Sequence, residues 1–121
     1  MLTAGLESWP SFSRDPALPE LFLEYGEEFD ERCDPDWAEA AMLVAEDSLC
    51  AFGLRKKPVE NITQNITHAL VGFCLVRIIR QLPFRGRRLA LASEVYVRPE
   101  YRGAGSKILL DTAQRCMRER G

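Results

Sequence analysis

The stretch VRPEYRGAGSKILL, residues 97–110, decides how this chain folds. A β-like run ends at Pro99, a short loop with Arg102, Gly103 and Gly105 follows, and the chain then becomes apolar at helical spacing. Apolar residues three and four positions apart lie on one side of a helix. We therefore predict that a strand passes through a glycine turn into a helix running from about Gly105 to Arg120.

The start of that helix is suited to an anion. Its first backbone N–H groups have no partner within the helix, and the positive end of the helix dipole lies there. Glycines allow a close backbone approach, and Arg102 and Lys107 add positive charge. Two readings stay open: a phosphate site, or a turn that only reverses the chain. The turn lacks the Gly-Lys-Ser/Thr ending of a nucleotide P-loop and the third glycine of a dinucleotide fingerprint.

Three strands and two helices are predicted upstream of the turn. The strand candidates are residues 50–57, 68–82 and 89–97, which are apolar and bounded by turn residues. Each helix opens with an aspartate cap followed by proline, at Asp15–Pro16 and at Asp34–Pro35. The predicted order α-α-β-β-β-α makes a single α+β domain spanning residues 1–121.

Composition indicates a globular protein of the cytoplasm. The chain is 46% hydrophobic and 28% charged, and its N-terminus has no signal-peptide pattern. No apolar run is long enough to cross a membrane. The four cysteines and the single histidine are too scattered for a metal site or a disulfide scaffold, so we expect reduced thiols and no metal. The two Asn-Ile-Thr sequons, at Asn61 and Asn65, would matter only in a secreted chain.

Charge divides the chain into two unlike halves. Residues 1–52 hold thirteen acidic and two basic groups, a net −11, whereas residues 53–121 hold fourteen basic and five acidic groups, a net +9. This pattern fits either a basic binding face or two halves that attract each other when packed. Five arginines gather around one predicted hairpin, but Phe84 is the lone aromatic there for base stacking, which argues against nucleic acid. They are Arg77, Arg80, Arg85, Arg87 and Arg88.

Residues 89–110, LALASEVYVRPEYRGAGSKILL, resemble the signature of the GNAT superfamily of N-acetyltransferases. In that family a strand ending in Val-x-Pro-x-Tyr-Arg-Gly leads into a pyrophosphate loop of the form Arg/Gln-x-x-Gly-x-Gly/Ala. The upstream run LVGFCLVRI, residues 70–78, is similar to the family's preceding strand. The resemblance covers roughly residues 50–121. The arrangement of the chain is also similar to that of small GNAT-like proteins of tailed phages. The matching residues are Val97, Pro99, Glu100, Tyr101, Arg102, Gly103 and Gly105.

The resemblance implies a GNAT-like mixed sheet with two N-terminal helices, a strand meander and a covering helix after the pyrophosphate loop. It also implies acetyl-CoA as co-substrate, with the pantetheine arm pairing along the strand at Val95 and Val97. A backbone N–H near Tyr96 or Val97 would polarise the thioester carbonyl. The pyrophosphate would lie on the amides of Arg102, Gly103, Ala104, Gly105, Ser106 and Lys107.

Glu94 and Tyr96 are the catalytic candidates of this resemblance. A carboxylate within an apolar strand is suited to accept the proton of the attacking amine, directly or through water. The alternative for Glu94 is a solvent-facing strand residue, and for Tyr96 it is packing.

Two departures from the family pattern leave a second function open. Either Lys107 replaces the final glycine or alanine of the loop, or Gly105 is that residue and the loop is shorter. The C-terminal strands of the family are also absent before Gly121, so either a second subunit or a protein partner completes the sheet, or the cleft for the pantetheine arm is incomplete. We predict an acetyl-CoA-dependent N-acetyltransferase of an unidentified amine. The alternative is a GNAT-like module that binds another protein, with little or no catalysis.

Overall fold

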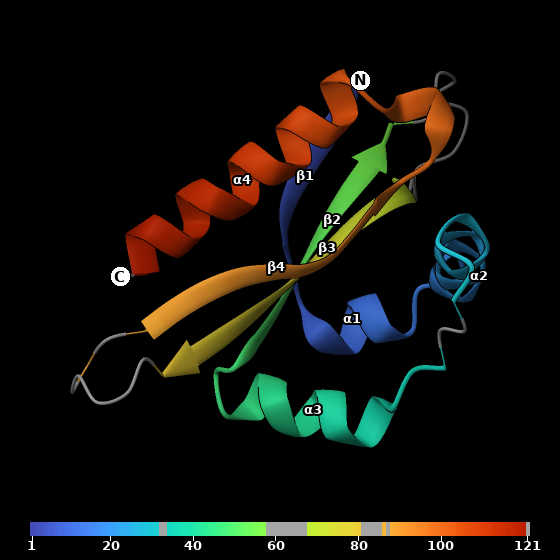
Figure 1. Ribbon diagram of the computed structural model, residues 1–121. Coiled ribbons are helices and arrows are strands. Elements are labelled where there is room, and N and C mark those ends of the chain that lie inside the picture. The colour runs from blue at the N-terminus through green and yellow to red at the C-terminus, as the bar shows by residue number, and fades with distance from the viewer. Residues whose placement is uncertain (32–33, 58–67, 81–85, 87, 121) are drawn as a thin grey trace.

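The computed structural model describes residues 1–31, 34–57, 68–80, 86 and 88–120. α4 covers one face of the sheet, and α1, α2 and α3 lie on the other (Figure 1). The predicted α+β class, the strand meander and the covering helix are confirmed. The elements are β1 (Leu2–Glu7), α1 (Trp9–Ser13), α2 (Leu18–Glu28), α3 (Trp37–Ala45), β2 (Leu49–Lys56), β3 (Ala69–Arg80), β4 (Arg88–Val97), the 3-10 turn η1 (Pro99–Tyr101) and α4 (Ala104–Arg120). The predictions for Cys33, both sequons, Phe84, Arg85 and Arg87 lie outside the described residues.

The sheet has the order β1-β2-β3-β4, and each strand pairs antiparallel with the next. The resemblance implied a mixed sheet, whereas the described pairings are all antiparallel. β3 and β4 share the longest register, which runs from Gly72 opposite Val97 to Arg80 opposite Arg88. Among the described strands, β1 and β4 form the two edges, so β4 has one side without a strand partner.

Alternation along the strands divides the core between the two faces of the sheet. Towards α4 lie Phe52, Leu54, Val71 and Val97, which pack with Leu109 of the helix. Towards α1 and α2 lie Phe73 and Tyr96 of the sheet, together with the helix residues Phe12, Leu18 and Leu21. Both layers are therefore anchored on the β2–β4 part of the sheet.

Sequence reasoning missed β1 and the short helix α1. The run LTAGLE is rich in residues that disfavour strands, so it gives no strong β signal. It becomes a strand because its main chain pairs with β2, from Leu2 opposite Lys56 to Glu7 opposite Ala51. A partner about fifty residues away is not visible in a local pattern.

Both predicted helix starts are two residues too early. Asp15 does accept a hydrogen bond, from the amide of Ala17 at 2.9 Å, but this closes a turn in front of α2. The cap of α3 is Asp36, whose carboxylate accepts from the amide of Glu39 at 3.0 Å. In each case the aspartate and proline precede the first helical turn instead of forming its start.

The ion pairs favour one of the two readings of the charge pattern. Between described residues, each ion pair joins an acidic group of residues 1–52 to an arginine of residues 53–121. Arg55 holds both Glu7 and Asp15, and its guanidinium also donates to the carbonyl of His68 at 2.9 Å. The hydrogen bond that Arg55 donates to Glu7 raises the pKa of Arg55. The two halves attract each other when packed.

Within the described residues, no helix combines the length and apolarity needed to cross a membrane. The same residues contain no group of three or more His, Cys, Asp or Glu side chains placed to hold a metal ion. Cys50 and Cys74 are buried, and Cys116 is half-buried.

Candidate active site

The β4–α4 turn has the form that the sequence predicts. After Val97 the chain makes one 3-10 turn, η1, and Gly103 takes a φ of +84°, a left-handed value that favours glycine. Nothing lies within 4 Å of a Cβ built on Gly103, so backbone conformation alone requires glycine there. α4 then begins at Ala104.

Four consecutive amides at this turn have no acceptor in the described part of the chain. They are those of Gly103, Ala104, Gly105 and Ser106. The amides on either side are used: Arg102 donates to Pro99 at 3.3 Å, and Lys107 donates to Gly103 at 3.0 Å. Such a group of N–H donors at the positive end of a 17-residue helix is suited to a phosphate.

Gly105 serves packing as well as the main chain. A Cβ at this position would lie 3.0 Å from Leu54 Cδ2 and 3.3 Å from Leu2 Cδ1. Leu54 is fully buried, so it has little room to move. The absence of a side chain therefore lets the first turn of α4 settle on β1 and β2. The sequence predicts a turn or a close ligand approach at Gly105 but gives no sign of this packing.

The side chain of Arg102 is engaged within the protein. Its Nε donates to the carbonyl of Val97 at 2.8 Å, and its NH2 group forms a short ion pair with Glu28 of α2. The guanidinium lies over the Tyr96 ring, 5.5 Å from the centroid. The hydrogen bond to Glu28 raises the pKa of Arg102. Arg102 thus ties α2 to the turn, and Glu28 offsets its charge.

The open edge of β4 presents the main-chain groups of Val95 and Val97. Arg98 donates to Val71 of β3 at 3.1 Å, and residues of an antiparallel pair alternate in the direction of their main-chain groups. Val97 and Val95 therefore turn their N–H and C=O groups away from β3, whereas Tyr96 turns its own towards Phe73. This places the two amides predicted to pair with the pantetheine arm on the unpaired edge.

A β-bulge places Glu94 and Ala92 on opposite faces of the sheet. Leu75 lies opposite Glu94, but Val76 lies opposite Ala92, so Ser93 is an extra residue in β4. Without the bulge, Ala92 and Glu94 would share a face, because strand side chains alternate. Ala92 instead lies beside α4, and Glu94 accepts a short hydrogen bond from the Tyr25 hydroxyl of α2.

Tyr96 is held away from the open edge. It is 5% exposed, and its hydroxyl donates to Glu24 at 3.1 Å. Burial raises the pKa of Tyr96, and the hydrogen bond to Glu24 raises it further. The Glu24 carboxylate also accepts a hydrogen bond from Arg98, whose Nη2 lies 3.0 Å from Oε2. These contacts give Tyr96 a packing role and leave its catalytic role a prediction.

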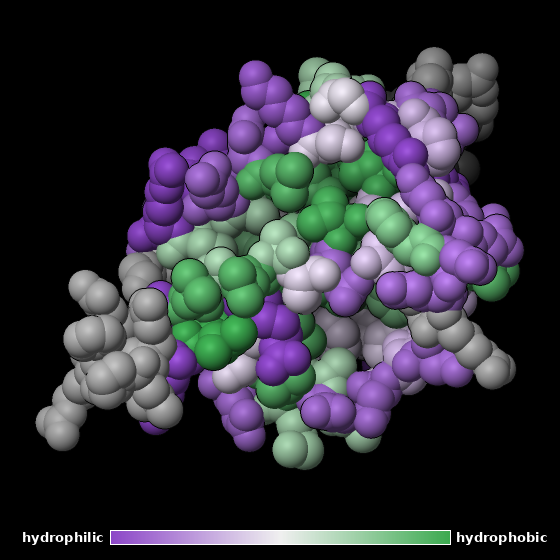
Figure 2. Space-filling view, viewed as in Figure 1, coloured by the Kyte–Doolittle hydropathy of each residue, from purple (hydrophilic) through white to green (hydrophobic). Residues whose placement is uncertain are grey.

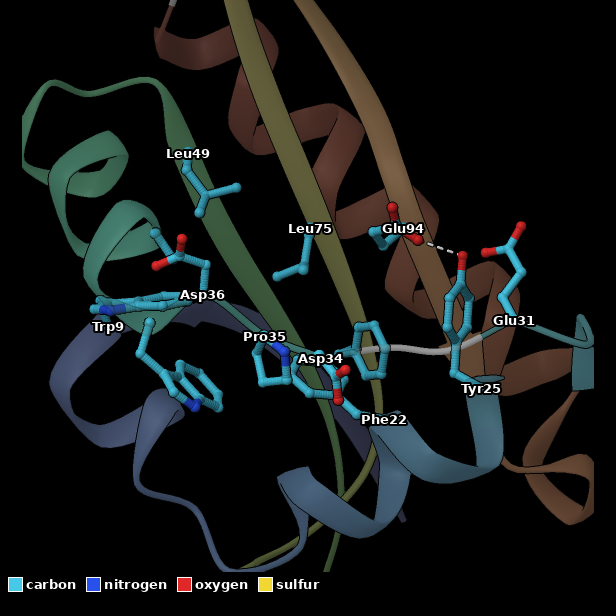
Figure 3. A pocket seen from close by; sticks show the side chains of 13 residues that line it. Trp9, Phe22, Tyr25, Glu31, Asp34, Pro35, Asp36, Leu49, Leu75 and Glu94 are labelled. Carbon is cyan, nitrogen blue, oxygen red and sulfur yellow. Dashed lines mark hydrogen bonds between the residues drawn. The ribbon is translucent and has the colours of Figure 1, made fainter. Parts of the chain in front are cut away.

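Glu94 and Tyr25 line one end of a cavity of about 350 Å³ on the α1–α3 side of the sheet (Figure 3). Trp9 and Asp36 lie towards its other end. The walls are largely aromatic, with Trp9 and Trp37 6.1 Å apart between ring centroids and Phe22 edge-on to Phe73 at 5.1 Å. The remaining lining residues are Glu31, Asp34, Pro35, Ala40, Leu49 and Leu75.

Sequence reasoning missed Tyr25, Glu28 and the cavity. Tyr25 belongs to the apolar stripe of α2, and its hydroxyl was the signal that it could also serve chemistry. Glu28 was one acidic residue among many in the N-terminal half. Their partners, Glu94 and Arg102, are 69 and 74 positions further along the chain, so only the fold brings them together.

Comparison with solved structures finds acetyltransferases, whereas no family model and no curated protein matches the chain. An acetyltransferase of Trypanosoma brucei superposes with a TM-score of 0.66 at 20% identity, over all of this chain and 78% of that one. A ribosomal-protein-alanine N-acetyltransferase from Brucella melitensis biovar Abortus 2308 superposes with a TM-score of 0.64 at 22% identity, over 99% of this chain and 74% of that one. The architecture that the sequence motif implied is thereby confirmed: this chain has the fold of the GNAT acetyltransferases.

Proposed function

We propose that the protein transfers an acetyl group from acetyl-CoA to an amine. One observation carries the proposal: the acceptor-free amides of residues 103–106, the open edge of β4 and the Glu94 carboxylate follow one another along a single strand-to-helix segment. An anion site, a pairing edge and a base are the three parts that acetyl transfer from a coenzyme thioester requires. The shared fold with acetyltransferases supports the same reaction class.

The coenzyme would lie along the outer side of this segment. Its pyrophosphate would accept from the amides of residues 103–106, where the α4 dipole favours negative charge. Its pantetheine arm would pair with the outward main chain of Val95 and Val97. Because the Val97 carbonyl already accepts from Arg102, the Val97 amide is the group left for the arm at that position.

The amine would approach from the cavity side, where Glu94 lies. The nitrogen lone pair attacks the acetyl carbonyl carbon, an outward amide of β4 stabilises the oxyanion, and Glu94 accepts the amine proton. The C–S bond then breaks, and the coenzyme thiolate leaves and takes up a proton from water. Tyr25 orients the Glu94 carboxylate through its hydrogen bond.

Thermal unfolding with coenzyme A tests the binding half of the proposal. At one hundred times its dissociation constant the coenzyme should stabilise the protein by about 2.7 kcal/mol, a rise in Tm of about 10 °C. Ser106→Glu should remove most of this rise, because a carboxylate in the first turn repels phosphate while suiting the helix itself. Ser106→Gln is the neutral control and should keep it. No rise in the wild type would refute coenzyme binding.

Release of coenzyme A from acetyl-CoA in the presence of amines tests the chemical half. Glu94→Gln should lower kcat about 10²–10⁴-fold and leave the coenzyme-dependent rise in Tm unchanged. Glu100→Gln is the matched control, since Glu100 is an exposed carboxylate of η1 near the same turn. Equal activity of Glu94→Gln and the wild type would rule out Glu94 as the base.

The alternative function, a protein-binding module, is favoured by a separate observation. Ile79, Leu89 and Leu91 at the far ends of β3 and β4 are 43–45% exposed. Figure 2 shows hydrophobic residues gathered on the face where β4 crosses the molecule in Figure 1. Sedimentation over a range of concentrations tests whether this edge joins two copies. Leu91→Lys should abolish any association, whereas Leu23→Lys, at an exposed leucine of α2, should not.

A further inference from the structure

The cavity beside Glu94 combines aromatic walls with acidic side chains. Four carboxylates line it, Glu31, Asp34, Asp36 and Glu94, and its described lining residues include no lysine, arginine or histidine. Aromatic faces attract cations through their ring quadrupole, and carboxylates do so through charge. A neutral or anionic ligand would gain neither interaction.

The acidic surface continues beyond this cavity. A second hollow of about 500 Å³ lies along the end of α2 and shares Phe22, Glu31 and Asp34 with the first. It adds Glu27 and Asp30, and its described lining residues likewise include no basic side chain. The acidic lining therefore extends from Glu94 to Glu27 and Asp30 at the end of α2.

We propose that the acceptor is a small linear amine with at least one further positive charge, such as a diamine or a longer oligoamine. This inference rests on the proposed acetyl transfer for the role of the ligand, but the cation site itself does not. One amine would lie at Glu94, where it is acetylated, and the next ammonium would lie between the indoles and Asp34 or Asp36. A cavity of about 350 Å³ is in the usual range for small ligands.

Both tryptophans of the chain, Trp9 and Trp37, line this cavity, so intrinsic fluorescence reports directly on its occupancy. The probe is 1,4-diaminobutane, titrated without coenzyme. n-Butylamine, with one charge, and 1,4-butanediol, with none, are the matched ligands. We expect the diamine to bind several-fold more tightly than the monoamine, and the diol not to bind. Equal affinities for all three would overturn the proposal.

A charge-neutralising variant tests whether the carboxylates are responsible. Glu31→Gln, Asp34→Asn and Asp36→Asn are combined, since asparagine at position 36 still caps α3. We expect about tenfold weaker diamine binding, because each solvated carboxylate contributes a factor of about two. The control combines Glu39→Gln, Glu46→Gln and Asp111→Asn, which change the net charge equally outside both hollows and should bind as the wild type does. Circular dichroism verifies that both variants fold, and unchanged binding in the first would overturn the proposal.

Acetyl-transfer assays separate this inference from the proposed function. Suppose that the diamine binds and that the charge-neutralised variant binds it more weakly as expected, but that coenzyme A gives no rise in Tm. This result would support the cation site and refute the acetyl transfer. Equal acetylation of a neutral aromatic amine and of 1,4-diaminobutane would support the acetyl transfer and overturn the cationic acceptor. Faster acetylation of the diamine, lost in the cavity variant and kept in the control, supports both.

Discussion

Gly105→Ala tests whether α4 is seated by close packing at its first turn. The added Cβ would lie 3.0 Å from Leu54 Cδ2 and 3.3 Å from Leu2 Cδ1, both tighter than ordinary carbon contacts. Overpacking of this kind costs about 1–3 kcal/mol, whereas replacing glycine by alanine in a helix gains up to about 1 kcal/mol. We expect a net loss of about 1 kcal/mol in the free energy of unfolding, or about 4 °C in Tm.

Urea unfolding followed by far-UV circular dichroism measures this loss, and a double-mutant cycle assigns it. Leu54→Val should by itself cost about 1 kcal/mol, but it also makes room for the new methyl group. The pair with Gly105→Ala should therefore cost less than the sum by at least about 0.5 kcal/mol. Gly103→Ala is the control: it costs about 1–2 kcal/mol through its positive φ and should be additive with Leu54→Val. A Gly105→Ala protein as stable as the wild type, with an additive cycle, would refute the packing argument.

Three further predictions concern the core and the base. Arg55→Met leaves Glu7 and Asp15 without their partner, so it should lower the free energy of unfolding in urea by about 2–3 kcal/mol. The loss is smaller than for a fully buried pair because the Arg55 side chain is 19% exposed. An unchanged urea midpoint would contradict this prediction. Burial raises the pKa of Cys74 to about 11, so the thiol stabilises the fold below pH 9, and about 2–3 kcal/mol is lost as the pH rises from 9 to 11. Cys74→Ala should lack that part of the pH dependence, and equal slopes for both proteins would count against it. Tyr25→Phe should lower kcat for acetyl transfer about tenfold with KM for acetyl-CoA unchanged, and a rise in KM alone would contradict an orienting role.

Local patterns predicted those parts of the fold that depend on nearby residues. The predicted strands at residues 50–57, 68–82 and 89–97 differ from β2, β3 and β4 by at most two residues at either end, and residues 81–82 lie outside the described part of the chain. Their apolar, β-branched runs are buried by the sheet itself, so composition and structure agree. β1 could not be predicted, because weak strand formers adopt this conformation only beside β2.

The site was predicted as far as its main chain and missed where side chains meet across the fold. The amides of residues 103–106 follow from a glycine turn before a helix, which is a local property. The bulge at Ser93 is not local, because it exists only in the register between β3 and β4. The bulge turns Ala92 towards α4, whereas Glu94 keeps the face of Tyr96, two residues further along β4. A pattern read from β4 alone cannot show that Tyr25 of α2 lies within reach of Glu94 on that face.

The division of charge along the chain has two consequences that depend on each other. Arg98 and Arg102 lie at the end of β4 and hold Glu24 and Glu28 of α2, so the acidic helix is fastened beside the anion site by the basic half. Those ion pairs offset the charge of two arginines close to the acceptor-free amides of residues 103–106. The main-chain N–H groups are therefore the principal attraction for phosphate. Neither pair involves Glu31 or Asp36, which line the cavity. The Glu94 side of β4 is therefore lined by acidic side chains, and this is the arrangement that an anionic acyl donor and a cationic acceptor would require to bind on opposite sides of one strand.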